Sequence, residues 1–92
     1  MRTIERSSAF KKDYKRARKS HGASLDEILI PVLKALANDV PLESKYRDHA
    51  LGGNWTDYRE CHIKPDLLLI YKKTGDNTLK LARMGSHSEL YG

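Results

Sequence analysis

The 92-residue sequence has one cysteine, Cys61, so it has no internal disulfide and suits a reducing cytosol. A disulfide between Cys61 and a second chain remains an alternative. No apolar run reaches the roughly 20 residues that a membrane-spanning helix needs. Residues 1–6 also lack the apolar core of a signal peptide. We therefore expect a cytoplasmic protein without membrane association, folded as a single domain over residues 1–92.

The sequence also lacks the motifs of several common catalytic sites. It has no Gly-rich phosphate loop, no nucleophile elbow and no paired-cysteine redox motif. Zinc is the remaining alternative, because histidines, Asp66 and Cys61 are possible ligands. None of these residues has the compact spacing of common zinc sites, and Cys61 and His62 would point to opposite faces of a strand. We expect no metal site and no cofactor.

Basic residues are concentrated near the N-terminus. The chain carries a net charge of +5, yet residues 1–24 alone hold eight Lys/Arg and two acidic residues, whereas residues 25–92 hold nine and ten. Such a block favours a polyanion or an acidic protein as partner. The alternative is a solvated helix face that only keeps a small domain soluble. The block lies on one short amphipathic segment, which favours the polyanion.

Two helices are predicted in the first half of the chain. Ser7 or Ser8 can cap a helix that carries Phe10, Tyr14 and Ala17 at helical spacing and ends at His21-Gly22. A second helix is expected from a capping box between Ser24 and Glu27. Pro31 falls opposite its apolar stripe, which predicts one helix, kinked there, and not two. The stripe consists of Leu25, Ile28, Leu29, Val32, Leu33 and Leu36.

The second half changes to strand patterns after an irregular stretch at residues 39–54. Residues 55–61 alternate polar and aromatic side chains, residues 67–71 form a continuous apolar run typical of a central strand buried on both faces, and residues 78–84 form the last strand. Residues 73–77 are the expected hairpin loop. The apolar Leu90 and Tyr91 predict that the short tail docks. With an edge strand near Ile4, the order β-α-α-β-β-β predicts an α+β fold in two layers, two helices on a four-stranded antiparallel sheet.

Three of the four histidines fall in the last 44 residues, together with Asp66 and Arg83. Imidazoles, a carboxylate and a guanidinium can move protons and hold a phosphate near neutral pH, which suggests RNA cleavage without a metal. His62 and Asp66 flank a proline-containing corner that can bring them into contact. Arg83 on the last strand can present its fork to a phosphate, with His87 folded over the same place. Each residue alone also fits an ordinary surface role, so the grouping carries the hypothesis.

The late motifs resemble the YafQ branch of the RelE toxins, within the RelE/ParE superfamily. The resemblance runs over essentially the whole chain, although the Leu-x-Gly-x-Trp and Leu-Ile-Tyr pieces mark only the superfamily's fold. The residues that carry it are Leu51-Gly-Gly-Asn-Trp55, Tyr58-Arg-Glu-Cys-His62, Pro65-Asp66, Leu69-Ile-Tyr71 and Arg83-Met-Gly-Ser-His87-Ser-Glu-Leu-Tyr91-Gly92.

The resemblance implies the toxin of a type II toxin–antitoxin system, a ribosome-dependent endoribonuclease (mRNA interferase) that cleaves mRNA in the A site. A cognate antitoxin would neutralise it, and operator DNA would be met only through that antitoxin. Carried over by motif position, the active site is His49, His62, Asp66, Arg83 and His87. Tyr91, often phenylalanine in relatives, would stack on a base. Contacts to ribosomal RNA phosphates would come from the basic helix, through Lys11, Lys12, Lys15, Arg16 and Lys19.

The hypothesis for the chemistry is attack of the RNA 2′-OH on the adjacent phosphorus. His87 is the expected general acid, Arg83 the phosphate stabiliser, His49 or Asp66 the base, and His62 an orienting or stabilising group. Two alternatives remain. A ParE-like inhibitor of DNA gyrase fits the strand motifs equally but needs no histidine cluster. A non-catalytic RNA-binding module would use the basic helix alone, with His87 and Asp66 dispensable.

Overall fold

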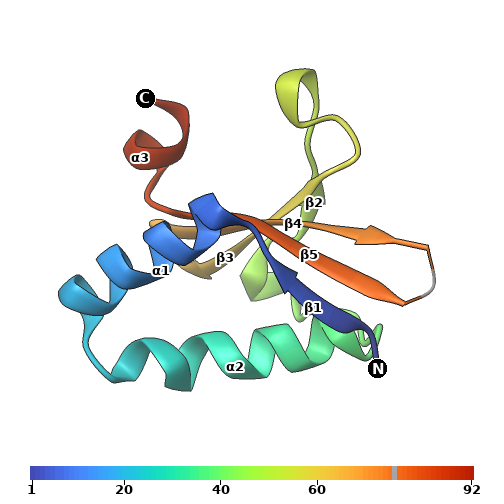
Figure 1. Cartoon of the computed structure of the whole chain (residues 1–92), viewed down its shortest axis with the longest axis horizontal. Coiled ribbons are helices and arrows are strands. Elements are labelled where there is room, and N and C mark those ends of the chain that lie inside the picture. The colour runs from blue at the N-terminus through green and yellow to red at the C-terminus, as the bar shows by residue number, and fades with distance from the viewer. Residues whose placement is uncertain (76) are drawn as a thin grey trace.

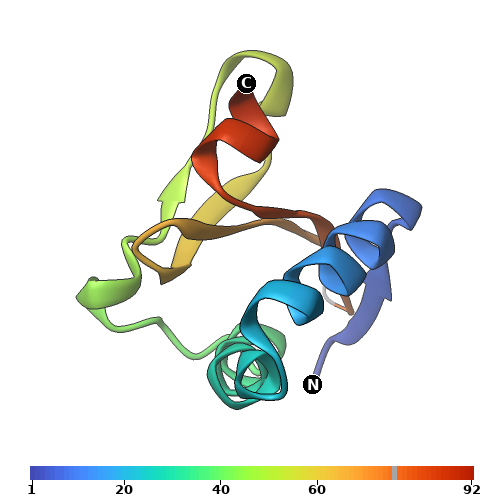
Figure 2. The ribbon, with the colours of Figure 1, turned by 90° about the vertical axis from the view of Figure 1, so that its left-hand side faces the viewer.

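The computed structural model describes residues 1–75 and 77–92, so Asp76 of the expected hairpin loop lies outside the described residues. A mixed sheet in the order β1-β5-β4-β3-β2 carries α1 and α2 on one face, while α3 and the turn η2 rise from the other (Figure 1, Figure 2). In chain order the elements are β1 (Thr3–Arg6), α1 (Ser8–His21), α2 (Ser24–Ala37), the 3₁₀ turn η1 (Ser44–Tyr46), β2 (His49–Ala50), η2 (Gly53–Trp55), β3 (Arg59–Lys64), β4 (Leu67–Thr74), β5 (Thr78–Gly85) and α3 (His87–Tyr91).

The predicted α+β fold with helices on a sheet is confirmed, but the strand count and the purely antiparallel arrangement are wrong. The sheet has five strands, because the two residues of β2 pair with β3. The first strand, β1, runs parallel to β5, with Thr3 opposite Thr78 and Arg6 opposite Leu81. All four β1 residues are exposed. Their sequence therefore holds no inward-facing pattern that would reveal a pairing direction.

The start and end of α1 are as predicted. Ser7 is the N-cap, with its Oγ accepting from the Phe10 N–H at 2.9 Å, and the same hydroxyl donates to the Ala82 carbonyl at 2.7 Å. Gly22 ends the helix with a positive φ of 66°, a conformation that glycine adopts without strain. The cap thus fastens α1 to the edge of β5 that lies beyond the end of β1.

The second helix is a single continuous helix through Pro31, as expected. Pro31 is exposed, whereas the stripe of Leu25, Leu29, Val32 and Leu36 is buried. The predicted capping box at Ser24 is wrong: the N-cap is Ala23, which makes no side-chain cap, and Ser24 Oγ donates back to the His21 carbonyl at 2.7 Å. Only two residues separate α1 from α2, so Ser24 already lies inside the first turn.

The core lies between the two long helices and one face of the sheet. Phe10 and Ala17 from α1 and the α2 stripe pack there against alternating residues of the central strands. In β4 this side takes Leu67, Leu69 and Tyr71, while Leu68 and Ile70 face the other way and are also buried. The prediction of a central strand buried on both faces is therefore confirmed, and the second face must itself be covered.

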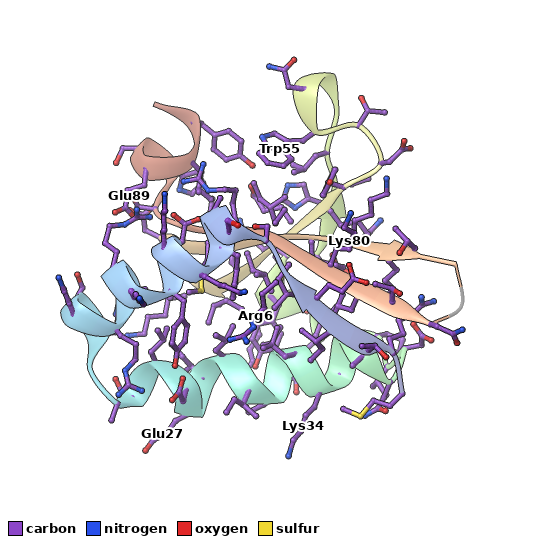
Figure 3. All side chains as sticks on the ribbon, viewed as in Figure 1. Arg6, Glu27, Lys34, Trp55, Lys80 and Glu89 are labelled. Atoms are coloured by element: carbon purple, nitrogen blue, oxygen red, sulfur yellow. The ribbon has the colours of Figure 1, made fainter. Side chains whose placement is uncertain are left out.

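The strand expected at residues 55–61 begins later than predicted. Residues 53–55 form η2, Asp57 has a positive φ of 75°, and β3 runs from Arg59 to Lys64. The alternation of aromatic and polar residues before Arg59 belongs to a turn and not to a strand. In Figure 3, Trp55 projects from η2 toward α3, over the face of the sheet opposite α2.

Asp39, just after α2, joins the N-terminus to the β4–β5 hairpin. Its Oδ1 accepts from Lys73 Nζ at 2.8 Å and from Arg2 Nε at 2.9 Å. These two hydrogen bonds, that from Lys73 first, lower the pKa of Asp39 to about 2. A carboxylate with a lowered folded-state pKa stabilises the fold above its unfolded pKa and loses that contribution as the pH falls through the folded value.

We therefore predict a pH-dependent effect of Asp39→Asn. Asparagine tolerates the left-handed φ of 58° at this position, so the substitution removes mainly the charge. The variant should be less stable than the wild type at pH 6, and the difference should close between about pH 4 and pH 2. Urea unfolding of the wild type and the variant at pH 6 and at about pH 2 measures this difference in stability. A difference that stayed constant would mean that the ionised carboxylate contributes nothing.

Candidate active site

The residues predicted as a site meet on the face of the sheet opposite α1 and α2. One row across the strands runs His49, Glu60, Ile70 and Arg83, from β2 through β3 and β4 to β5. The next row of β3 and β4 pairs His62 with Leu68. Because side chains alternate along a strand, Glu60 and His62 share this open face, while Cys61 between them is buried in the core. Burial raises the pKa of the Cys61 thiol to about 12, so it is no nucleophile.

A bulge in β5 places Arg83 in this row. Ile70 pairs with Arg83 but Tyr71 pairs with Leu81, so Ala82 is the extra residue. The bulge allows both Leu81 and Met84 to face the core although they are three residues apart. A regular strand would send one of them outward. The register shift therefore keeps the core filled and directs Arg83 to the open face.

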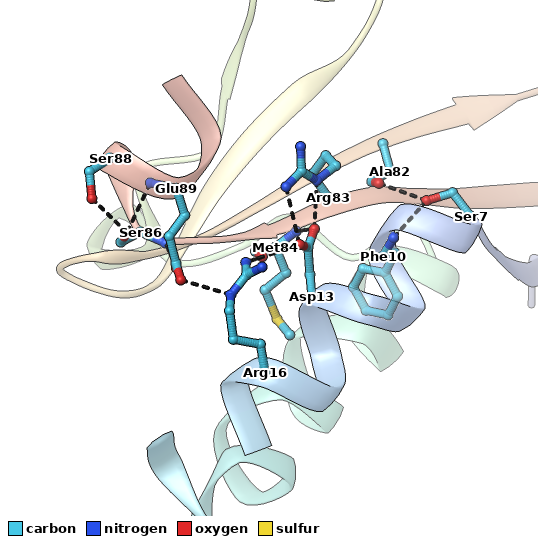
Figure 4. Close-up of polar contacts among 10 residues, drawn as sticks. All are labelled: Ser7, Phe10, Asp13, Arg16, Ala82, Arg83, Met84, Ser86, Ser88 and Glu89. Atoms are coloured by element: carbon cyan, nitrogen blue, oxygen red, sulfur yellow. Dashed lines mark hydrogen bonds and ion pairs between the residues drawn. The ribbon is translucent and has the colours of Figure 1, made fainter. Parts of the chain in front are cut away.

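The guanidinium of Arg83 is held by a buried carboxylate on α1. Asp13 Oδ2 accepts from Arg83 Nε at 2.6 Å and Oδ1 from its Nη2 at 3.1 Å, and the Met84 N–H adds a bond of 3.0 Å to Oδ2. Figure 4 shows this fork, with the remaining nitrogen of Arg83 directed away from Asp13. Burial alone would raise the pKa of Asp13, but the hydrogen bonds from Arg83 and Met84 and the charge of Arg16 leave it below its ordinary value.

Arg16 extends this network to α3. Its Nη2 donates to Asp13 Oδ1 at 2.9 Å, and its Nε pairs with Glu89 Oε2 at 2.7 Å (Figure 4). Arg16 is thus engaged by two carboxylates, unlike the lysines with which the sequence grouped it. Glu89 also closes a capping box with Ser86 at the start of α3. The tail therefore docks as a short capped helix, as Leu90 and Tyr91 predicted.

Asp66, in the turn between β3 and β4, holds the imidazole of His87. Its Oδ1 accepts from the His87 backbone N–H at 3.0 Å and from His87 Nδ1 at 2.7 Å. These two bonds, the backbone one first, lower the pKa of Asp66. The predicted contact partner of Asp66 was His62, and the structure makes this hydrogen bond to His87. A carboxylate on Nδ1 leaves His87 Nε2 directed away as the nitrogen that can exchange a proton.

The other two histidines, His49 and His62, are also held through Nδ1, in each case by a backbone carbonyl. His49 Nδ1 lies 2.6 Å from the Arg47 carbonyl and His62 Nδ1 lies 3.3 Å from the Pro65 carbonyl. Since a carbonyl oxygen only accepts, both neutral rings carry their proton on Nδ1 and present Nε2 as an acceptor. The His62 ring centroid lies 6.3 Å from that of His49 and 5.8 Å from that of His87. The three imidazoles therefore form one continuous group.

Glu60 lies beneath this group. Its side chain is 5% exposed, and its Oε1 is 3.5 Å from His49 Nε2 and 3.8 Å from His62 Nε2. The Tyr91 hydroxyl donates to its other oxygen, Oε2. Burial and this bond to Glu60 raise the pKa of Tyr91, so Tyr91 stays protonated, with its ring half exposed on α3.

Sequence reasoning missed two acidic residues of the site, Asp13 and Glu60. Each left a signal. Asp13 sits at the helical spacing of Phe10 and Ala17, so an acid falls on the buried side of α1. Glu60 precedes His62 by two positions, so the two share one face of β3. Neither pattern states which residue is the partner, because Arg83 is 70 positions from Asp13 and Tyr91 is 31 from Glu60.

The remaining predicted residues lie elsewhere. Lys11, Lys12, Lys15 and Lys19 are exposed on α1, and His21 lies outside the site, with its Nδ1 3.4 Å from Lys64 Nζ. Within residues 1–75 and 77–92, no three His, Cys, Asp or Glu side chains are gathered as a metal site requires. None of the helices described is long and apolar enough to cross a membrane.

Comparison with known proteins gives consistent matches over the whole chain. Residues 2–92 match the family described as "Bacterial toxin of type II toxin-antitoxin system, YafQ". The mRNA interferase toxin YafQ of Escherichia coli K12 is 40% identical over 91 residues, which cover 99% of this chain and 97% of that protein. The fold is similar to a metal-bound toxin from Helicobacter pylori, 50% identical with a TM-score of 0.88 over 99% and 100% of the two chains. The toxin of the E. coli DinJ–YafQ complex is 41% identical, with a TM-score of 0.87 and full coverage of both chains.

Proposed function

Because this chain belongs to the YafQ family of toxins of bacterial type II toxin–antitoxin systems, we propose that it is a ribosome-dependent mRNA endonuclease that inhibits translation. The observation that carries the proposal is the open face of the sheet, where three Nδ1-held imidazoles share one face with a partly exposed arginine, Arg83. These groups supply a base, an acid and a cation, which are what RNA cleavage through the 2′-OH requires. Action on ribosomes would place the protein in the cytoplasm.

In the proposed reaction His49 is the general base. Its ring is about half exposed, its Nε2 is the acceptor nitrogen, and Glu60 Oε1 at 3.5 Å stabilises the imidazolium that forms when Nε2 takes the proton of the 2′-OH. Asp66, the other candidate for the base, is engaged by the two N–H groups of His87. His62 lies between the other two rings and orients them by packing against both.

His87 is the general acid and Arg83 the phosphate stabiliser. The attacking 2′-oxygen forms a bond to phosphorus, the bond from phosphorus to the 5′-oxygen breaks, and His87 Nε2 gives its proton to that leaving oxygen. The products are a 2′,3′-cyclic phosphate and a free 5′-OH. The Asp66 carboxylate holds His87 Nδ1 at 2.7 Å and so fixes the ring with Nε2 as the nitrogen that delivers the proton. Arg83, oriented by Asp13, offers its free nitrogen to the non-bridging oxygens.

The experiment that tests the function adds the purified protein to an mRNA with and without translating ribosomes. Primer extension should show cuts at the codon in the A site only when ribosomes are present. Cleavage of free mRNA at the same rate would contradict the ribosome dependence. Breaks in DNA linked to gyrase, with intact mRNA, would favour the ParE-like alternative.

We expect catalysis to need no metal, because the acid, the base and the cation are all side chains. A chelator in the assay would disturb ribosomes, so the toxin alone is treated with EDTA and desalted. The stripped protein should cleave mRNA at an unchanged rate, and added copper or zinc should not raise that rate. Loss of activity on stripping, restored by one of these metals, would contradict the prediction. This test is needed because a related toxin from H. pylori has been crystallised with metal bound.

The basic helix is expected to hold ribosomal RNA. The four exposed lysines of α1 are the proposed phosphate contacts, while we assign Arg16 chiefly to the link between Asp13 and Glu89. Reversing Lys11, Lys12 and Lys15 to glutamate should weaken ribosome binding and flatten its dependence on salt, since each lost phosphate contact lowers the slope by about 1. Sedimentation with ribosomes at several salt concentrations measures this effect. Unchanged binding would remove α1 from the interface.

A cognate antitoxin is the second proposed partner. The support is the E. coli DinJ–YafQ complex, whose toxin this chain resembles over its full length. Operator DNA would be contacted only through that antitoxin. Co-expression with the small protein encoded beside the toxin should give a stable complex and relieve growth inhibition.

A further inference from the structure

A cavity of about 630 Å³ adjoins the candidate active site at the end of β3. The two residues of β2 pair only with Arg59 and Glu60, so the following part of β3 is left open to this space. Three segments line it: the middle of α2, residues 45–47, and residues 62–65. Figure 2 shows η1 and the β3–β4 turn side by side, with α2 beneath them. His62 belongs to both the cavity wall and the imidazole group, so the cavity is continuous with the site.

The wall combines an apolar surface with cations. Its apolar part is made of Ile28, Pro31, Ile63 and Pro65, with the ring of Tyr46. Its charged part holds the three cations Lys45, Arg47 and Lys64 against one acid, Glu27. The volume lies within the roughly 300–1,000 Å³ of sites that bind small molecules. Apolar walls with a few cations suit a nucleotide, whose base is apolar on its faces and whose phosphate is anionic.

Among the residues that the structure describes, the two lysines of this wall make only long polar contacts. Lys45 Nζ lies 3.8 Å from an oxygen of Glu43, and Lys64 Nζ lies 3.4 Å from His21 Nδ1. Arg47 has a left-handed backbone with φ of 50°, and its carbonyl holds His49 while its side chain lines the cavity. A non-glycine residue in this conformation is under strain that its surroundings must support. Arg47 therefore links the orientation of His49 to the cavity wall.

We propose that this cavity is a subsite for a further RNA nucleotide, one that adjoins the two nucleotides flanking the cleaved bond. The base lies against the apolar wall, and its phosphate is held by Arg47 and Lys64. The proposal rests on the proposed function, because His62 ties the cavity to the site of cleavage. The cavity would then add affinity for RNA longer than the two nucleotides that flank the broken bond.

The test measures the affinity of the purified protein for fully 2′-O-methylated RNA, which lacks the attacking hydroxyl and cannot be cleaved. A tetranucleotide should bind at least about tenfold more tightly than a dinucleotide, the size expected for a charge-assisted hydrogen bond. Lys64→Ala combined with Arg47→Asn, which tolerates the left-handed backbone, should abolish this gain. Glu27→Lys, which adds a cation to the wall, should increase it. Lys34→Ala, on the same helix but away from the cavity, is the matched control.

Three binding results would overturn the proposal. The double variant could retain the tetranucleotide's advantage, Glu27→Lys could reduce it, or the double variant could lose affinity only for a polyglutamate peptide, which would make the cavity a protein-docking site. The proposed function fails separately, if the wild type does not cleave mRNA on ribosomes. If the wild type cleaves and the double variant cleaves with an unchanged KM, only the subsite is wrong.

Discussion

Replacement of His87 by alanine is expected to slow mRNA cleavage by at least about a hundredfold while the protein stays folded. A positioned general acid contributes roughly 10²–10⁴-fold to the rate. His87 is the first residue of α3, and its Nδ1 is held by Asp66, so Nε2 is the nitrogen that can reach the leaving 5′-oxygen. The side chain is more than half exposed. Its removal therefore opens no core cavity and should cost little stability.

The rate is best measured in single-turnover cleavage of mRNA on stalled ribosomes. His21→Ala is the matched control, because His21 lies outside the imidazole group, and it should cleave like the wild type. If the effect of His87→Ala came from loss of structure, urea unfolding would show it. A folded His87→Ala protein with full activity would remove His87 from the mechanism and with it the proposed acid.

Asp13→Ala is expected to lower the free energy of unfolding by about 3–5 kcal/mol, the usual cost of removing one partner of a buried ion pair. Asp13 is 2% exposed and accepts hydrogen bonds from Arg83, Arg16 and the backbone of Met84. Without it, Met84 N–H loses its acceptor and the guanidinium of Arg83 loses both oxygens that orient it. Such a loss is a large part of the 5–15 kcal/mol of a typical domain.

Urea unfolding at neutral pH measures this change, with Glu43→Ala as control. Glu43 forms an exposed pair with Lys45 at 3.8 Å, and such pairs contribute about 0–1 kcal/mol. Asp13→Asn keeps one acceptor oxygen, so it should be less destabilised than Asp13→Ala. It should nevertheless cleave mRNA more slowly than the wild type, because Arg83 is less well held. Equal stability of Asp13→Ala and Glu43→Ala would contradict the role given to this carboxylate.

The parts of the fold that could be predicted are those with a strong local pattern. The spacing of Phe10, Tyr14 and Ala17 predicts α1, and the run Leu67–Tyr71 predicts the buried strand β4. The two residues of β2 are too few to show a period, and the exposed residues of β1 carry no inward face. Ser24 and Glu27 have the spacing of a capping box, but no such box forms. The short link to α1 draws Ser24 into the first turn of α2, so that its side chain bonds back to the His21 carbonyl.

The site was predicted by residue type and not by contact. The sequence groups His49, His62 and His87; the strand register brings His49 and His62 together, and the docking of α3 adds His87. It cannot show that Asp66 holds His87 and not His62, because that depends on where α3 docks. Nor does any local signal reveal the bulge at Ala82, which turns Arg83 into the row of Glu60. Tertiary packing decides these contacts.

The central claim, that this face cleaves RNA through its 2′-OH, is tested most directly by the chemistry of the new ends. Messenger RNA is cleaved on translating ribosomes, and mass spectrometry identifies the termini left by the wild type and by His87→Ala. The account predicts a 2′,3′-cyclic phosphate and a 5′-OH from the wild type, both greatly reduced in the variant. A 5′-phosphate with a free 3′-OH would contradict it, because those ends arise from attack by water and leave no part for the 2′-OH.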